Sequence, residues 1–193
     1  MVKMADINTS GSSDHLGNAL SRYVGERYIW GVTRIFLGLI FFWAFIDKVF
    51  GLGFATCRND AGVVEYMCSS AWLNGGSPTY GFLNFGTAGP FKGIFQAMAG
   101  NVVVDWLFML GLLGIGVALI FGIGMRVACL SGGLMVFLMW LAHLPPEHHP
   151  FLDDHVMYAI ILIGLWKTKA GRWLGFGEKW ENLEIVKKFP FLA

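Results

Sequence analysis

Long apolar segments alternate with shorter polar stretches along this chain. The apolar segments run from Trp30 to Phe50, from Val102 to Ile123, from Val127 to Leu144 and from His155 to Thr168. A helix needs about 20 mostly apolar residues to cross the hydrocarbon core of a bilayer. The fourth segment is short, and it crosses only if Phe151 and Leu152 extend it while Lys167 and Lys169 reach outward to the interface. No segment shows the alternation of a strand, so the pattern predicts spanning helices.

The pattern therefore predicts an all-α integral membrane protein, a four-helix transmembrane bundle with a long structured outer loop at 51–101. We expect a tail at 1–28, the transmembrane domain at 29–172 and a second tail at 173–193. Hydrophobic residues make up 55% of the chain and charged residues only 14%, against about 25% charged in soluble domains. A net charge of +1 speaks against a nucleic-acid-binding protein, which would carry a basic face.

Lysine and arginine are distributed unevenly between the two sides of the predicted bundle. One side carries most of them: Lys3, Arg22, Arg27, Arg126, Lys167, Lys169, Arg172, Lys179, Lys187 and Lys188. The other side carries Lys48, Arg58 and Lys92. The positive-inside rule then predicts a multi-pass protein of the plasma membrane with both termini in the cytoplasm. The N-terminal tail is expected to form a short surface helix from His15 to Arg27, and the first span is expected to be a retained anchor.

The predicted outer loop contains two cysteines and a strong turn signal. Cys57 and Cys68 would face a compartment that permits disulfides, and we favour a structural disulfide over a redox-active pair. Closing this loop would stabilise the protein by about 3 kcal/mol in the chain-entropy model. The run NGGSPT at 74–79 indicates a turn, and Pro90 is expected to open a short helix through Ala99. The loop is expected to fold as a cap over the mouth of the bundle.

Ionisable residues inside spans are costly and are therefore functional candidates. They gather at the outer ends of the predicted helices, where we expect them to converge on one pocket. The candidate proton acceptors and other catalytic groups are Asp47, Asp105, Asp154 and His155, and the candidate substrate-binding groups are Lys48 and His143. Each has a simpler interpretation. Asp105, Asp153 and Asp154 stand where carboxylates cap helices, and Lys48 reaches the interface by extending its side chain.

Two further polar features have open interpretations. The residue types of His143, Glu147, His148, His149, Asp153 and His155 suit a metal, but their spacing matches no known motif, so no metal site is predicted. Arg34 lies about a turn inside the cytoplasmic end of the first span. It either extends to the interface, which is the favoured interpretation, or pairs with a lipid headgroup or a quinone carbonyl.

Several stretches resemble the DoxX/DoxD family. They are FFWAFIDKVFGLGFAT, AWLNGGSPTYGFL, GPFKGIF, VDWLFMLGLLGIGVALIFGIGMR and LPPEHHPFLDDHVMYAIILIGL, in that order between Trp30 and Gly171. The most specific parts are NGGSPT and the run from Pro145 to His155. This family includes the large, membrane-embedded subunit of thiosulfate:quinone oxidoreductase. The resemblance implies a four-helix membrane protein, and for some members it implies electron transfer from thiosulfate to a membrane quinone with formation of tetrathionate.

Three functions follow as hypotheses. The first is a membrane redox subunit that oxidises a small sulfur anion on the outer face and reduces quinone, which enters laterally between helices. The chain contains no flavin, haem or iron–sulfur motif, so electrons would pass directly or through a second membrane or outer-face subunit. The second is a non-catalytic anchor or assembly protein for another redox complex. The third is a small transporter or metal-handling protein that uses the His-rich connection. An oligomer is compatible with all three.

Overall fold

The computed structural model describes residues 10–59, 61–146 and 149–193. Within these ranges the fold is all-helical, and the only β pairing is an isolated bridge between Arg58 and Val64. The long helices are α1 (Ser10–Phe50), α4 (Val102–Phe121), α5 (Met125–Ala142) and α6 (Asp154–Lys167). The shorter ones are η1 (Trp72–Asn74), α2 (Tyr80–Phe85), α3 (Lys92–Ala97), η2 (Ala170–Arg172), α7 (Gly177–Glu181), α8 (Glu184–Lys188) and η3 (Pro190–Leu192). The prediction of an all-helical protein is confirmed.

Three of the described helices are long and apolar enough to cross a membrane. They are the part of α1 from Val24 to Phe50, then α4 and α5. Only 28% to 33% of the most apolar stretch of each is buried, and large apolar side chains such as Phe36, Leu107 and Leu134 are exposed. Helices that leave their apolar sides uncovered are typical of lipid contact. The fourth predicted span corresponds to α6, whose 14 residues fall short of the usual crossing length.

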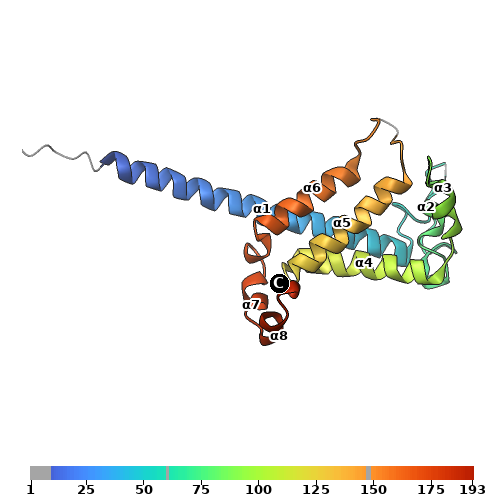
Figure 1. Cartoon of the computed structure of the whole chain (residues 1–193). Coiled ribbons are helices and arrows are strands. Elements are labelled where there is room, and N and C mark those ends of the chain that lie inside the picture. The colour runs from blue at the N-terminus through green and yellow to red at the C-terminus, as the bar shows by residue number, and fades with distance from the viewer. Residues whose placement is uncertain (1–9, 60, 147–148) are drawn as a thin grey trace, which may run out of the picture.

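The first helix differs from the prediction at its N-terminal end. The surface helix expected from His15 to Arg27 is not separate, because α1 continues without interruption from Ser10 to Phe50. No proline interrupts these 41 residues, and a straight helix of this length extends roughly 60 Å. The first part of α1 therefore projects well beyond the other helices (Figure 1).

The long helices pack in pairs. α1 lies along α4 and α5 lies along α6, while α4 and α5 contact each other less extensively. The backbones of α1 and α4 approach each other closely at two glycines, because a Cβ at Gly38 would lie 2.8 Å from the backbone nitrogen of Ile120, and one at Gly116 would lie 2.8 Å from that of Phe42. The core between the helices is formed by buried apolar side chains that include Leu37, Phe41, Met109, Leu112, Ile115, Leu119, Val136, Leu162 and Leu165.

The two ends of the helix assembly carry different connections (Figure 1). At the end that we call the loop end, α1 stops, α4 begins and α5 stops, and the segment 51–101 folds over them with η1, α2 and α3. The helix predicted after Pro90 is confirmed as α3, although it is shorter than expected. At the opposite end, the tail end, a turn at Gly122–Gly124 joins α4 to α5, and the C-terminal segment packs against this turn.

Candidate functional site

A cavity of about 1210 Å³ lies at the loop end between α4 and α5. Both helices line it with residues spaced three or four apart, which places them on one face of each helix. From α4 these are Val104, Leu107, Phe108, Gly111 and Ile115, and from α5 they are Ser131, Leu134, Met135, Leu138, Met139 and Ala142. Phe82, Leu83 and Phe95 of the segment 51–101 add further apolar wall. The cavity is large enough for a small organic molecule with an apolar body.

Polar side chains also line the cavity. Apart from Ser131 of α5, they come from the end of α1 and from the segment 51–101, and they include Lys48, Thr56, Ser69, Ser70, Ser77 and Thr79. Among the described residues, Lys48 is the only charged side chain in the wall. Its ammonium nitrogen lies 5.9 Å from the centre of the Phe108 ring, within reach of a cation–π interaction. The cavity is thus mainly apolar, with one cation and several hydroxyl groups.

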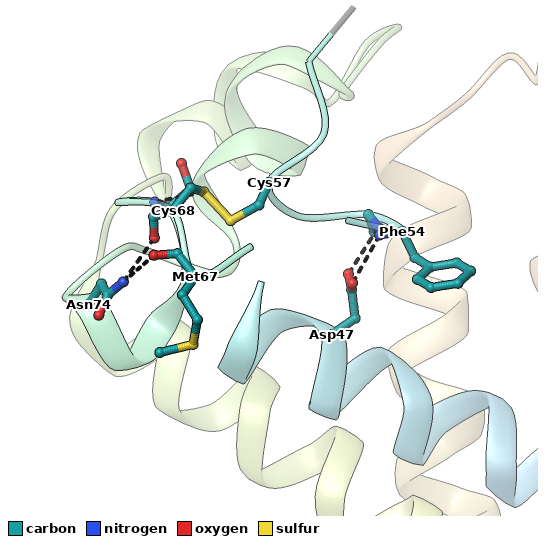
Figure 2. Close-up of a disulfide and its surroundings, with 8 residues drawn as sticks. Asp47, Phe54, Cys57, Met67, Cys68 and Asn74 are labelled. Atoms are coloured by element: carbon teal, nitrogen blue, oxygen red, sulfur yellow. Dashed lines mark hydrogen bonds between the residues drawn. A yellow bond between two sulfur atoms is a disulfide. The ribbon is translucent and has the colours of Figure 1, made fainter. Parts of the chain in front are cut away.

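Asp47 holds the chain that follows α1. Its side chain is only 1% exposed, and its two carboxylate oxygens accept hydrogen bonds from the backbone N–H groups of Phe54 at 3.0 Å and Ala55 at 2.9 Å. Figure 2 shows this carboxylate directed at the backbone beside Phe54. A buried carboxylate needs such donors in place of water. Asp47 therefore fixes the path of the loop that leads to Cys57.

The predicted disulfide between Cys57 and Cys68 is confirmed. The two Cα atoms are 5.6 Å apart, and 11 positions separate the residues in sequence. The side-chain amide of Asn74 donates to the carbonyl oxygens of Met67 and Cys68 (Figure 2). Cys57 is also part of the cavity wall. The disulfide and this amide thus fix the part of the loop that borders the cavity.

Asp105 holds the turn formed by NGGSPT. It lies in the first turn of α4 and is buried. One of its oxygens accepts from the hydroxyl of Ser77 at 2.9 Å, from the backbone N–H of Thr79 at 3.2 Å and from the hydroxyl of Thr79 at 2.5 Å. The helix cap is instead Asn101, whose side chain accepts from the N–H of Val103. Asp105 is therefore a link between α4 and two hydroxyl groups of the cavity wall.

The remaining predicted site residues lie away from the cavity. The Nδ1 atom of His143 is 2.9 Å from the carbonyl oxygen of Gly86. Asp153 is the N-cap of α6, as predicted, and its carboxylate also lies 2.6 Å from Nδ1 of His155. Asp154 is exposed in the first turn of α6. These contacts attach the end of α5 to the segment 51–101 and start α6, as capping residues commonly do.

The predicted convergence of the charged groups on one pocket is therefore wrong. Of Asp47, Lys48, Asp105, His143 and His155, only Lys48 lines the cavity. The two buried carboxylates instead accept hydrogen bonds from loop backbone or loop hydroxyl groups, because a buried charge needs hydrogen-bond partners in place of water. The catalytic and substrate-binding roles assigned to these residues stay predictions.

Arg34 also differs from the favoured interpretation, because its side chain does not extend to the interface. It is completely buried. Its guanidinium donates to the carbonyl oxygens of Leu119 and Ile120 at the end of α4, and to those of Trp173 and Leu174 after η2. The last carbonyls of a helix have no partner within the helix, and a planar guanidinium with five N–H groups suits several of them at once. Arg34 therefore joins the middle of α1 to the tail end of α4 and to the C-terminal segment.

No metal-binding group emerges among the described side chains, where no three His, Cys, Asp or Glu residues come together. The predicted residue set included Glu147 and His148, and both lie outside the described residues. The hydroxyl-bearing residues Ser77 and Thr79 form part of the cavity wall but are not among the predicted site residues. The one sequence signal at these residues is the turn pattern NGGSPT, because the carboxylate beside them, Asp105, lies 26 and 28 positions away in the chain.

Comparisons of the chain with models of known protein families, with curated proteins and with solved structures find no match. The resemblance to the DoxX/DoxD family therefore stays a prediction that depends on the sequence stretches given above.

Proposed function

We propose that this chain is a membrane-embedded redox subunit similar to the large subunit of thiosulfate:quinone oxidoreductase. In this proposal α6 is the fourth span of a bundle, the loop end faces outward and both termini are in the cytoplasm. A small sulfur anion is oxidised at the loop end, and its electrons pass to quinone. The observation that carries the proposal is the apolar cavity between α4 and α5, with Lys48 as the one charged side chain in the described part of its wall.

The cavity suits a quinone in shape and chemistry. A quinone has a flat polar head and a long apolar tail, and it reaches a protein through the bilayer. Exposed apolar residues of α4 and α5, such as Leu107 and Leu134, also line the cavity, so a lateral entrance from lipid lies between these helices. The ammonium group of Lys48 would bind a quinone carbonyl or the sulfur anion, because a charge-assisted hydrogen bond is stronger than a neutral one.

The reaction needs both electrons and protons to be delivered. Two thiosulfate anions each lose one electron and join through a new sulfur–sulfur bond to give tetrathionate. The quinone takes these two electrons and two protons and becomes quinol. Asp105 is the carboxylate best placed to pass protons, because it is hydrogen-bonded to Ser77 and Thr79, and both of these residues line the cavity. Asp154 and His155 have no part in this scheme.

The test uses the full chain in lipid nanodiscs with thiosulfate and decylubiquinone. Quinone binding is followed by quenching of tryptophan fluorescence, and turnover by the loss of quinone absorbance. Replacing Lys48 with Met removes the only cation in the described cavity wall, so we expect at least about tenfold weaker quinone binding, which corresponds to about 1.4 kcal/mol. The matched control is Lys92→Met, because Lys92 is exposed and belongs to α3 at the same end.

The outcomes separate the proposals. Failure of the unchanged protein to bind quinone would rule out the cavity as a quinone site. Binding without turnover would instead favour the second candidate, an anchor or assembly protein for another redox complex. The observation that favours this second candidate is the group of exposed aromatic residues on the segment 51–101, which includes Phe54, Tyr66 and Phe85. Turnover that appears only when a partner subunit is added would support it.

A further inference from the structure

The last part of the chain, from Gly177 to Ala193, forms a small platform at the tail end. We call it the C-terminal platform, and it contains α7, α8 and η3. Just before it, the N–H of Phe176 donates to the carbonyl of Phe121 at 2.8 Å. Arg126 donates its N–H to Ala193 at 2.8 Å and its guanidinium to Pro190 at 3.0 Å. The platform is therefore attached to the last turn of α4 and to the first turn of α5.

These attachments place the platform at the depth where two spans end. Figure 1 shows α7 and α8 extending to one side of α4, across the direction of its axis. A segment that runs across a span at its end lies parallel to the membrane plane. Within the platform, the indole N–H of Trp180 donates to the carbonyl of Leu192 at 2.7 Å, so the short helices are held together rather than extended.

The platform leaves its large apolar side chains uncovered. Ile185 is 58% exposed and Phe191 is 59% exposed. Leu183 and Phe189 are exposed as well, and Val186 is the one large apolar residue of the platform that is buried. So many exposed apolar side chains within nine positions require a partner surface. Because they belong to a segment held at the end of the spans, the headgroup region of the bilayer is the nearest such surface.

Basic side chains surround these apolar residues. Lys179, Lys187 and Lys188 are all exposed. The ammonium nitrogen of Lys179 lies 5.8 Å from the Phe176 ring, and that of Lys188 lies 5.9 Å from the Phe189 ring. Phe189 of the platform and Phe176 just before it thus each have a cation beside the ring, which is an arrangement that allows a ring to enter the headgroup layer while the ammonium stays with the phosphates.

The net charge of this region is positive. From position 167 to the end, the sequence has six basic residues and three glutamates. Glu181 is bound by Arg172, and this hydrogen bond raises the pKa of the guanidinium. This pair removes one acidic and one basic group from the count, so five basic residues and two glutamates remain. The charge that remains is complementary to an anionic surface.

We propose that the C-terminal platform binds anionic phospholipids in the leaflet at the tail end. Its phenyl and aliphatic side chains enter the headgroup layer, and Lys179, Lys187 and Lys188 bind the lipid phosphates. This inference does not depend on the proposed redox function, because it uses neither the cavity nor Lys48.

The test uses the full chain in phosphatidylcholine bilayers that contain a trace of spin-labelled lipid. The fraction of motionally restricted label gives the relative affinity for phosphatidylglycerol and for phosphatidylcholine. We expect the unchanged protein to prefer phosphatidylglycerol about threefold or more at low salt. The variant with Lys179→Gln, Lys187→Gln and Lys188→Gln should bring this ratio close to one. The control variant carries Arg58→Gln and Lys92→Gln, two exposed cations at the loop end, and should keep most of the preference.

A second measurement tests the position of the platform directly. A spin label is attached at Ile185→Cys, because Cys57 and Cys68 form a disulfide and Cys129 is buried. Collision with oxygen should exceed collision with a water-soluble nickel complex if the label lies in the lipid. An equal affinity for both lipids, an unchanged ratio in the triple variant, or a label fully open to the nickel complex would each overturn the proposal.

Discussion

Buried side chains of opposite charge stabilise the tail end and the loop end of the helix assembly. At the tail end, the buried cation Arg34 binds four backbone carbonyls. At the loop end, the buried carboxylates Asp47 and Asp105 accept backbone N–H groups and hydroxyl groups. In each case the charge is opposite to the partial charge of the groups that it binds, which are carbonyl oxygens at Arg34 and N–H or O–H groups at the two carboxylates.

The second difference between the two ends is packing. Near the tail end α1 and α4 touch through Gly38, whereas at the loop end α4 and α5 are separated by the cavity. Arg34 belongs to the closely packed tail end, whereas Asp47 and Asp105 are buried beside the cavity without lining it. Lys48 differs from them because its side chain lines the cavity. This contrast shows why a buried charge in this chain is not by itself evidence of chemistry.

The largest loss of stability is expected from removing the hydrogen bonds of Arg34 at the tail end. Replacing Arg34 with Met keeps a long side chain but removes all of the hydrogen bonds to the four carbonyls. Buried polar groups without partners are costly, and each hydrogen bond to a charged group contributes about 1.5–3 kcal/mol. Because such contributions do not add fully, we expect the free energy of unfolding to fall by about 4 kcal/mol. Steric-trap unfolding in bicelles measures this change.

Arg126→Met is the matched control for this prediction. Arg126 is also an arginine at the tail end, but it is exposed and its guanidinium binds one carbonyl, that of Pro190. We expect a loss of about 1 kcal/mol or less, in the range of a single hydrogen bond. Equal losses in the two variants would show that the four carbonyls at Arg34 do not stabilise the tail end.

A smaller loss of stability is expected from weakening the hydrogen bonds of Asp105 at the loop end. Asp105→Asn keeps the shape of the side chain but removes the negative charge that accepts three hydrogen bonds. We expect the free energy of unfolding to fall by about 2 kcal/mol, because hydrogen bonds to charged groups are stronger than those to neutral ones. The turn at 76–79 should also exchange its amide hydrogens faster, which mass spectrometry detects.

Asp154→Asn provides the comparison, since Asp154 is exposed in the first turn of α6. Its loss should stay near 0.5 kcal/mol, the size of a surface interaction with the helix dipole. If Asp105→Asn is as mild as this control, Asp105 does not hold the turn.

The sequence predicted the features that depend on local pattern. The apolar runs predicted three of the spanning helices, and the spacing and expected compartment of Cys57 and Cys68 predicted their disulfide. The turn at NGGSPT and the helix after Pro90 follow from the conformational preferences of glycine and proline. Each of these signals lies within a short stretch of chain, so no knowledge of the tertiary packing is needed.

The features that the sequence did not predict depend on distant partners. The four carbonyls bound by Arg34 belong to residues 85 to 140 positions away in the chain. Asp105 finds its donors 26 and 28 positions upstream. The cavity depends on how far apart α4 and α5 lie, and apolar periodicity indicates only that these faces avoid water. A face directed at a cavity and a face directed at lipid therefore look alike in the sequence.

The smallest expected effect distinguishes the packing of the two ends. Gly38→Ala would place a Cβ 2.8 Å from the backbone nitrogen of Ile120, and a backbone cannot move aside without separating α1 from α4. Overpacking of this kind costs about 1–3 kcal/mol, partly offset by the better helix propensity of alanine, about 1 kcal/mol. We expect a net loss of about 1 kcal/mol.

Gly111→Ala is the equivalent change at the loop end, with the opposite expected sign. Its Cβ would meet only the terminal methyl of Met135, and both residues line the cavity. The flexible methionine side chain can turn into this space, so the gain in helix propensity remains and stability should rise by about 0.5 kcal/mol. Unfolding measured side by side should therefore show opposite shifts for the two variants. Two losses of similar size would mean that α4 is as tightly enclosed at the cavity as it is against α1.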